Sequence, residues 1–170
     1  MIRPELSIIT NVSFDHVSIL GDTLEKIATE KSGIIKKNTP VLIGECQNDS
    51  IKQVFVEKAK SENAPICFAQ DYETLDFLCE LRGVYQEKNK HTVMVAFTLL
   101  LQLGFEISDA ALRDGFLQVT ERTGLKGRWQ ELSSLPRVVC DTGHNEAGIR
   151  EVVKQIEKEH FDTLRIVFGM

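Results

Sequence analysis

The sequence predicts an α/β fold, in which a mostly parallel sheet carries helices on its faces. Three short segments, residues 6–12, 40–44 and 64–68, are rich in β-branched residues and apolar on both faces, as buried parallel strands are. Helix signals separate them, which gives the order βαβαβ. With 170 residues, the chain is long enough for one domain, or for one domain and part of a second.

The helices of this first region have recognisable ends. Asp22, followed three residues later by Glu25, predicts a capping box at the start of the first helix, and Gly33 predicts its end. A second, amphipathic helix is expected over residues 50–62.

Beyond the third strand, the pattern changes twice. Alternating apolar residues between 70 and 85 predict an extended edge strand or hairpin. Two helices are then expected, over residues 87–103, ended by Gly104, and over residues 108–119, capped by Ser108.

The glycines and polar residues of 120–127 are typical of a linker. After it the sequence predicts a strand over 137–140, a helix over 147–159 and a strand over 164–168. A single βαβ unit cannot form a stable sheet, so the second domain is expected to be incomplete. We therefore expect a first domain over residues 1–120, a linker over 121–128 and a second domain over 129–170.

Composition excludes several classes of protein. The formal charge of −5, without a basic block, argues against a nucleic-acid-binding protein. The longest apolar stretch, residues 93–101, is too short to span a bilayer. The four cysteines form no CxxC pair and the N-terminus lacks a signal pattern, which predicts reduced thiols in a cytoplasmic protein.

Lys31 is the most informative single residue. Together with Leu24, Ile27 and Ala28 it falls on one face of the first helix, the face expected to be buried. Its amine could extend to the surface near the helix end, or it could be carbamylated, which would turn a cation into a metal-binding carboxylate.

Two further groups of polar residues follow strands. Asp15 and His16 lie in the loop after the first strand, where ligands gather in open α/β sheets, and they could serve a divalent cation or simply be surface residues. Asp141, His144 and Asn145 join a strand to a helix, a geometry suited to a ribose and phosphates, although Asn145 could be only a helix cap.

Arg128 stands at the end of the linker, where its guanidinium could bridge two domains onto a phosphate or remain solvated. The sequence contains neither a GxxxxGK[ST] nor a GxGxxG phosphate-binding motif.

Several blocks resemble the folylpolyglutamate synthase and dihydrofolate synthase family of the Mur ligase superfamily. The most specific block runs from Ile9 to Ile34 and contains ITNVSFDH, LGDT and IATEKSGI. Three others agree in order and spacing: LRGVYQEKN from Leu81, GRWQE from Gly127, and DTGHN from Asp141. The resemblance implies the latter part of a P-loop-type ATPase domain followed by the start of a Rossmann-like C-terminal domain.

The resemblance also implies an activity: ATP-dependent formation of an amide between a pteroate or folate carboxyl group and L-glutamate, through an acyl phosphate. ATP and Mg²⁺ are the implied cofactors. The implied partners are small molecules rather than nucleic acid or membrane, and the full-length enzyme is expected to be a monomer.

Carried over position by position, His16 matches the family's magnesium-binding histidine and Lys31 its carbamylated lysine. Asn89 matches the residue that reads the adenine, and Arg128 matches an interdomain arginine near the phosphates. Asp141 and His144 match the ribose and phosphate side of the nucleotide site.

The sequence also departs from the family. Tyr85 stands where many members have histidine, and Glu146 where proline is common. The family's P-loop should precede the first strand, so we expect an internal fragment that binds ATP poorly and does not ligate on its own. Two other hypotheses stay open: a fragment of a Mur-type cell-wall amino-acid ligase, which the order from Asp15 to Gly33 disfavours, and a non-catalytic α/β binding or structural module.

Overall fold

The computed structural model describes residues 2–14 and 21–169, and it confirms the α/β class. Strands β1 (Ser7–Ile9), β2 (Val41–Ile43) and β3 (Ile66–Phe68) form a parallel sheet in the order β1-β2-β3. All three predicted strands therefore exist, each shorter than predicted. Helices α2 (Leu24–Ser32) and α3 (Asp49–Ser61) link them in the expected alternation.

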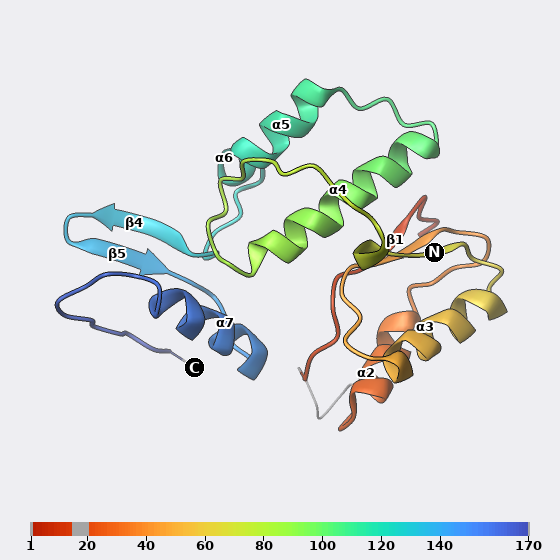
Figure 1. The fold of residues 1–170 in the computed structure, drawn as a ribbon, viewed down its shortest axis with the longest axis horizontal. Coiled ribbons are helices and arrows are strands. Elements are labelled where there is room, and N and C mark those ends of the chain that lie inside the picture. The colour runs from red at the N-terminus through yellow and green to blue at the C-terminus, as the bar shows by residue number, and fades with distance from the viewer. Residues whose placement is uncertain (1, 15–20, 170) are drawn as a thin grey trace.

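Helices cover both faces of the sheet (Figure 1). Side chains alternate along β2, so neighbouring residues point to opposite faces. Val41 and Ile43 belong to the core shared with α2 and α3. Leu42, between them, belongs to the core under α4 (Gln86–Gln102), with Val95 and Leu99. All three β2 side chains are fully buried. The apolar run that predicted a buried strand thus fills two cores at once.

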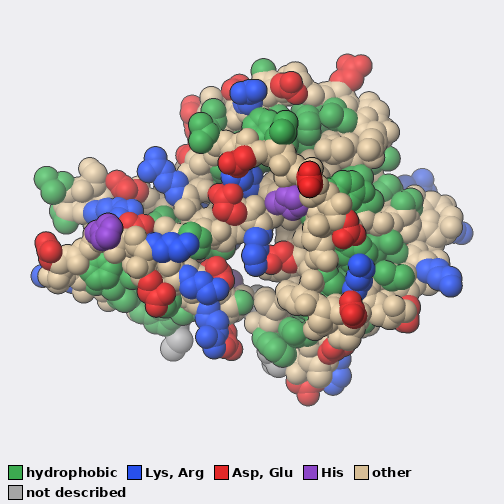
Figure 2. All heavy atoms as spheres, in the orientation of Figure 1, with side chains coloured by type: hydrophobic (Ala, Val, Ile, Leu, Met, Phe, Trp, Pro, Cys, Tyr) green, Lys and Arg blue, Asp and Glu red, His purple; other side chains and the backbone are tan. Residues whose placement is uncertain are grey.

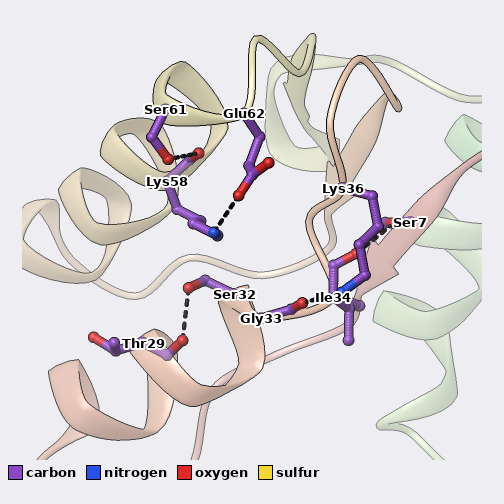
Figure 3. Close-up of polar contacts among 9 residues, drawn as sticks. All are labelled: Ser7, Thr29, Ser32, Gly33, Ile34, Lys36, Lys58, Ser61 and Glu62. Atoms are coloured by element: carbon purple, nitrogen blue, oxygen red, sulfur yellow. Dashed lines mark hydrogen bonds and ion pairs between the residues drawn. The ribbon is translucent and has the colours of Figure 1, made fainter. Parts of the chain in front are cut away.

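Hydrogen bonds hold the segment after α2 against β1 (Figure 3). A separate ion pair lies at the C-terminal end of α3. Ser7 Oγ donates to the carbonyl of Ile34 at 3.0 Å, and Lys36 Nζ donates to the carbonyl of Gly33 at 2.7 Å. Lys58 Nζ lies 2.5 Å from a carboxylate oxygen of Glu62, one turn later. The chain therefore leaves α2 in a defined direction, toward β2.

The predicted capping box at the start of α2 is wrong. Thr23, not Asp22, is the N-cap, and its side chain accepts a hydrogen bond from the amide of Lys26 at 3.2 Å. Asp22 instead accepts from the amine of Lys26, and Glu25 accepts from the hydroxyl of Ser50. Thr23 is the N-cap because its hydroxyl is one residue nearer than the Asp22 carboxylate to the free amides of the first turn. The predicted end at Gly33 is confirmed.

The predicted edge strand or hairpin between 70 and 85 is also wrong. This segment starts with the single 3₁₀ turn Ala69–Asp71 and then follows an irregular path to α4. Several of its apolar residues are exposed, including Leu75 at 76% and Leu78 at 84%. Alternation of apolar and polar residues does not by itself produce a strand where no neighbouring strand supplies hydrogen-bond partners. The predicted helices after it are confirmed as α4 and α5 (Asp109–Leu117), with Ser108 capping α5.

The predicted linker is partly helical, because α6 (Val119–Thr123) continues into it before Gly124 ends the helix in a left-handed conformation. Beyond it lie a two-stranded antiparallel sheet, β4 (Gln130–Ser134) with β5 (Arg137–Cys140), and helix α7 (Glu146–Ile156). Strand β5 and helix α7 were predicted, whereas β4 was not. Its polar sequence, QELSS, carries no strand pattern.

The strand predicted over residues 164–168 does not form. Its apolar side chains are exposed, with Val167 at 100%. The predicted βαβ unit is therefore replaced by a hairpin and a helix, because β5 pairs with β4 rather than with the C-terminal segment. None of the described helices is long and apolar enough to cross a bilayer. All four cysteines are free thiols.

Candidate functional site

The carboxyl ends of β1 and β2 lie side by side and are tied together. The amides of Gly44 and Glu45 donate to the carbonyls of Ile9 and Thr10, each at 2.8 Å. The side-chain amide of Gln47 donates to the carbonyl of Val12 at 2.7 Å. This is the edge of a parallel sheet at which ligands bind in open α/β folds.

Lys31 reaches this edge from the last turn of α2. Its face of the helix is buried as predicted, since Ile27 and Ala28 are fully buried and Lys31 is half-buried. Its amine donates a hydrogen bond to the carbonyl of Asn11 at 2.8 Å. The cationic head therefore turns back toward the loop after β1. The two candidate residues on that loop, Asp15 and His16, lie outside the described residues.

The first turn of α4 comes to the same edge. The amine of Lys88 lies 2.6 Å from a carboxylate oxygen of Glu45, which follows β2. This hydrogen bond and ion pair raise the pKa of Lys88. Beside the pair is a hollow of about 420 Å³, whose lining includes Gly44 and His91.

Asn89 is exposed on this first turn, and its side-chain amide donates to Gln86 Oε1 at 2.9 Å. It lies four residues after Tyr85, so the two residues share a helix face. Asn89 is therefore available to a ligand at the start of α4.

The second group of candidate residues centres on Asp141, just after β5. One carboxylate oxygen, Oδ2, accepts from the hydroxyl of Tyr85 at 2.5 Å and from the amide of Trp129 at 2.7 Å. The other, Oδ1, accepts from the amide of Gly143 at 2.8 Å. Burial and the hydrogen bond to Asp141 raise the pKa of Tyr85, so its phenol stays protonated. Sequence reasoning noted Tyr85 only as a departure from the family and did not foresee this contact.

Arg128 lies next to this carboxylate, on the segment that leads into β4. Its guanidinium donates to the hydroxyl of Thr142 and, at 3.3 Å, to the carbonyl of Gly127. Gly127 has φ +68°, and a side chain there would collide with Thr142, 2.4 Å away. The close approach of the two segments thus requires glycine at this position. A hollow of about 350 Å³ lies alongside Arg128 and is also lined by Arg82.

His144 is exposed, and its Nδ1 lies 3.1 Å from the carbonyl of Thr142. Asn145 caps α7, because its side chain accepts from the amide of Gly148 at 2.8 Å. The helix-cap interpretation of Asn145 is therefore the one that the structure bears out. A capping side chain has its acceptor engaged in the helix.

The structure brings the candidates together in two groups rather than one. Asp141 and His144 lie in the turn from β5 to α7, Arg128 contacts this turn through Thr142, and Tyr85 connects it to α4. Lys31 belongs to the other group, since its amine donates to the carbonyl of Asn11 in the loop after β1. Figure 2 shows a hollow between the part formed by the hairpin and α7 and the part formed by the parallel sheet, with charged side chains along its rim.

The metal site predicted from His16 and Lys31 stays a prediction, because His16 lies outside the described residues. Within the described part of the chain, no group of three His, Cys, Asp or Glu side chains lies together as a metal centre would require. As an ammonium, Lys31 repels a cation, and only its carbamate could ligate one. No chemical step is therefore assigned to a metal through these residues.

The parallel sheet with helices on both faces defines an α/β protein, and the polar turn after β5 lies in its C-terminal part. No protein-family profile matches the chain. A dihydrofolate synthase/folylpolyglutamate synthase from Bacillus subtilis is 30% identical over 98% of the chain and 43% of its own length.

Two solved structures show the same fold. A folylpolyglutamate synthase complex with AMPPCP and folate aligns over 91% of the chain and 42% of its own, with a TM-score of 0.76 and 24% identity. Escherichia coli FolC in complex with DHPP and ADP aligns over 94% and 39%, with a TM-score of 0.74 and 24% identity. The chain is a relative of the folylpolyglutamate and dihydrofolate synthases, as the sequence blocks predict. It spans less than half the length of these curated relatives.

Proposed function

We propose that this chain forms part of an ATP-dependent ligase that adds L-glutamate to dihydropteroate or to a folate. The observation that carries the proposal is the relationship to the Bacillus subtilis synthase over 98% of the chain. The related solved structures include complexes with AMPPCP, ADP and folate, which supports ATP and a folate as substrates. A divalent metal is supported by a structure of this kind that holds Mn, AMPPNP and L-glutamate.

The proposed reaction joins a carboxylate to an amine in two steps. The carboxylate oxygen of the pteroate or folate attacks the γ-phosphorus of ATP, which gives an acyl phosphate and releases ADP. The amine of glutamate then attacks the acyl carbon, the C–N bond forms, the amine loses a proton and phosphate leaves. Both steps crowd negative charge onto oxygen atoms, so they need cationic groups nearby.

Our assignment of roles follows the geometry of the turn after β5. Asp141 has three donors on a carboxylate that offers about four acceptor positions, which leaves room on Oδ1 for one ligand hydroxyl such as that of a ribose. Arg128 supplies a guanidinium beside that carboxylate for a phosphate. His144 is exposed on the same turn for the phosphate side, and Asn89 is the residue proposed to meet the adenine.

Mg²⁺ would supply charge neutralisation on the phosphates. We propose His16 and the carbamylated form of Lys31 as its ligands, on the strength of the family resemblance. The position of the Lys31 amine beside the loop after β1 supports this pairing, because that loop carries His16.

A chimeric enzyme tests the proposal. The chain would replace the matching segment of the Bacillus subtilis synthase, and glutamate-dependent release of phosphate from ATP would be measured with dihydropteroate and with folates. We expect ligation, and we expect Asp141→Asn and Lys31→Met to lower turnover at least about tenfold, the scale of losing one transition-state contact. Lys126→Met, which removes an exposed lysine, is the matched control.

A chimera that folds and binds ATP but forms no amide would contradict the proposal. The chain on its own is expected to bind MgATP more weakly than micromolar and to catalyse no ligation. Isothermal titration calorimetry with the 170-residue chain measures the first quantity directly. Micromolar affinity together with normal turnover would show that this expectation is wrong.

A further inference from the structure

Tyr85 links two parts of the chain that are far apart in sequence. It immediately precedes α4, and its hydroxyl lies 2.5 Å from Asp141 Oδ2, which follows β5. A phenol that donates to a carboxylate makes a charge-assisted hydrogen bond, which is shorter and stronger than a neutral one. The contact therefore restricts both side chains.

The backbone on either side of Tyr85 is built to hold the ring in this place. Gly83 is buried, and a Cβ on it would lie only 2.7 Å from a carbon of the Tyr85 ring. The ring thus lies directly against the Gly83 backbone, where no other residue would leave room.

A second hydrogen bond joins the same segment to α7. The amide of Val84 donates to Gln155 Oε1 at 3.0 Å. Gln155 is 8% exposed, and its side-chain nitrogen donates to Glu159 at 3.2 Å, so the orientation of its amide is fixed. Residues 83–85 are consequently held to the C-terminal part at two points.

The hydroxyl of Tyr85 also decides which edge of the Asp141 carboxylate is available. With Tyr85 and the amide of Trp129 both on Oδ2, the open acceptor position is on Oδ1. Without the phenol, the carboxylate could rotate about its terminal torsion, which has only broad preferences of its own.

We propose that Tyr85 is a positioning residue for Asp141: it fixes the carboxylate after β5 and, through it, the start of α4 against the C-terminal hairpin. The link to nucleotide binding rests on the proposed function, whereas the positioning itself does not. Histidine can also donate a hydrogen bond to a carboxylate, so it is the conservative replacement for this role.

The test uses the 170-residue chain and needs no ligand. The sequence holds two tyrosines and one tryptophan, so in a Tyr72→Phe background tyrosinate absorbance reports Tyr85 alone and the emission reports Trp129 alone. Asp141→Asn should lower the midpoint of Tyr85 ionisation by about one unit or more, as loss of a neighbouring charge does. Asp162→Asn, which removes an exposed carboxylate elsewhere, should leave it unchanged.

A second pair of variants separates positioning from simple packing. With Tyr72 intact, Tyr85→Phe keeps the ring and should shift the Trp129 emission, because the amide of Trp129 shares its acceptor with the phenol. Tyr85→His should restore the emission. Far-ultraviolet circular dichroism confirms that each variant is folded. Unchanged Tyr85 ionisation in Asp141→Asn, or unchanged Trp129 emission in Tyr85→Phe, would overturn the proposal, and neither readout depends on ligase activity.

Discussion

The amine of Lys31 lies 2.8 Å from the carbonyl oxygen of Asn11, two residues after the end of β1. A lysine on the buried face of α2 is thus accommodated by directing its charge to the carboxyl edge of the sheet. That edge is where the loop after β1 and the start of α4 meet. The position of the charge follows from the helix period, which places Lys31 on the same face of α2 as the buried Ile27 and Ala28.

Replacing Lys31 by methionine should therefore destabilise the chain while keeping the aliphatic part of the side chain in place. The hydrogen bond from a charged donor to Asn11 is lost, which costs about 1–3 kcal/mol. Urea denaturation followed by circular dichroism measures the change in the free energy of unfolding. Lys126→Met is the matched control, and it should change stability by less than about 0.5 kcal/mol. Equal effects of the two variants would contradict the structure.

The parallel sheet could be predicted because its three strands are apolar on both faces, and only a sheet covered on both sides needs such strands. Leu42 illustrates the point, since it packs under α4 while both its neighbours pack under α2 and α3. The hairpin β4–β5 could not be predicted, because Gln130–Ser134 is polar. Its pairing with β5 depends on tertiary contacts and not on a local sequence pattern. Because β5 pairs with β4, the apolar residues 164–168 lie outside any strand.

The start of α2 offers a direct comparison between sequence pattern and structure. Thr23→Ala removes the side chain that accepts from the Lys26 amide and should cost about 1 kcal/mol. Asp22→Ala removes only an exposed contact with the Lys26 amine, which solvent screens, and should cost less than Thr23→Ala. Thermal or urea unfolding of the two variants ranks them. A larger loss for Asp22→Ala would favour the predicted capping box over the observed N-cap.

The candidate site was only partly accessible to sequence reasoning. Asp141 could be found because a carboxylate at the end of a strand, followed by a helix, is a recurrent ligand geometry. Its donors could not, since Tyr85 lies 56 residues away in sequence and Trp129 contributes a backbone amide, which no residue type reveals. Gln155 is similar: a polar residue on α7 gave no signal that it would be buried against Val84.

Acid should weaken the contact between the hairpin and the segment after α7. Arg137 of β5 lies 2.5 Å from a carboxylate oxygen of Glu159, and this hydrogen bond holds the pKa of Glu159 below its usual value. A depressed pKa in the folded state means that the stabilisation is present above the unfolded pKa, near 4.5, and is lost as the pH falls below it. Glu159→Gln should therefore reduce the fall in melting temperature below about pH 4.5. Glu106→Gln, an exposed control, should leave the profile unchanged.

Two glycine-to-alanine substitutions should act in opposite directions. At Gly83 the added methyl would lie 2.7 Å from a Tyr85 ring carbon, so the ring must move and the bond to Asp141 must lengthen or break. At Gly115, inside α5, no atom lies within 4 Å, and alanine should stabilise the helix by about 0.5–1 kcal/mol. Thermal unfolding should thus rise for Gly115→Ala and fall for Gly83→Ala, and only Gly83→Ala should shift the Trp129 emission. If Gly83→Ala left both the melting temperature and that emission unchanged, the ring of Tyr85 could not be seated against the Gly83 backbone as the structure has it.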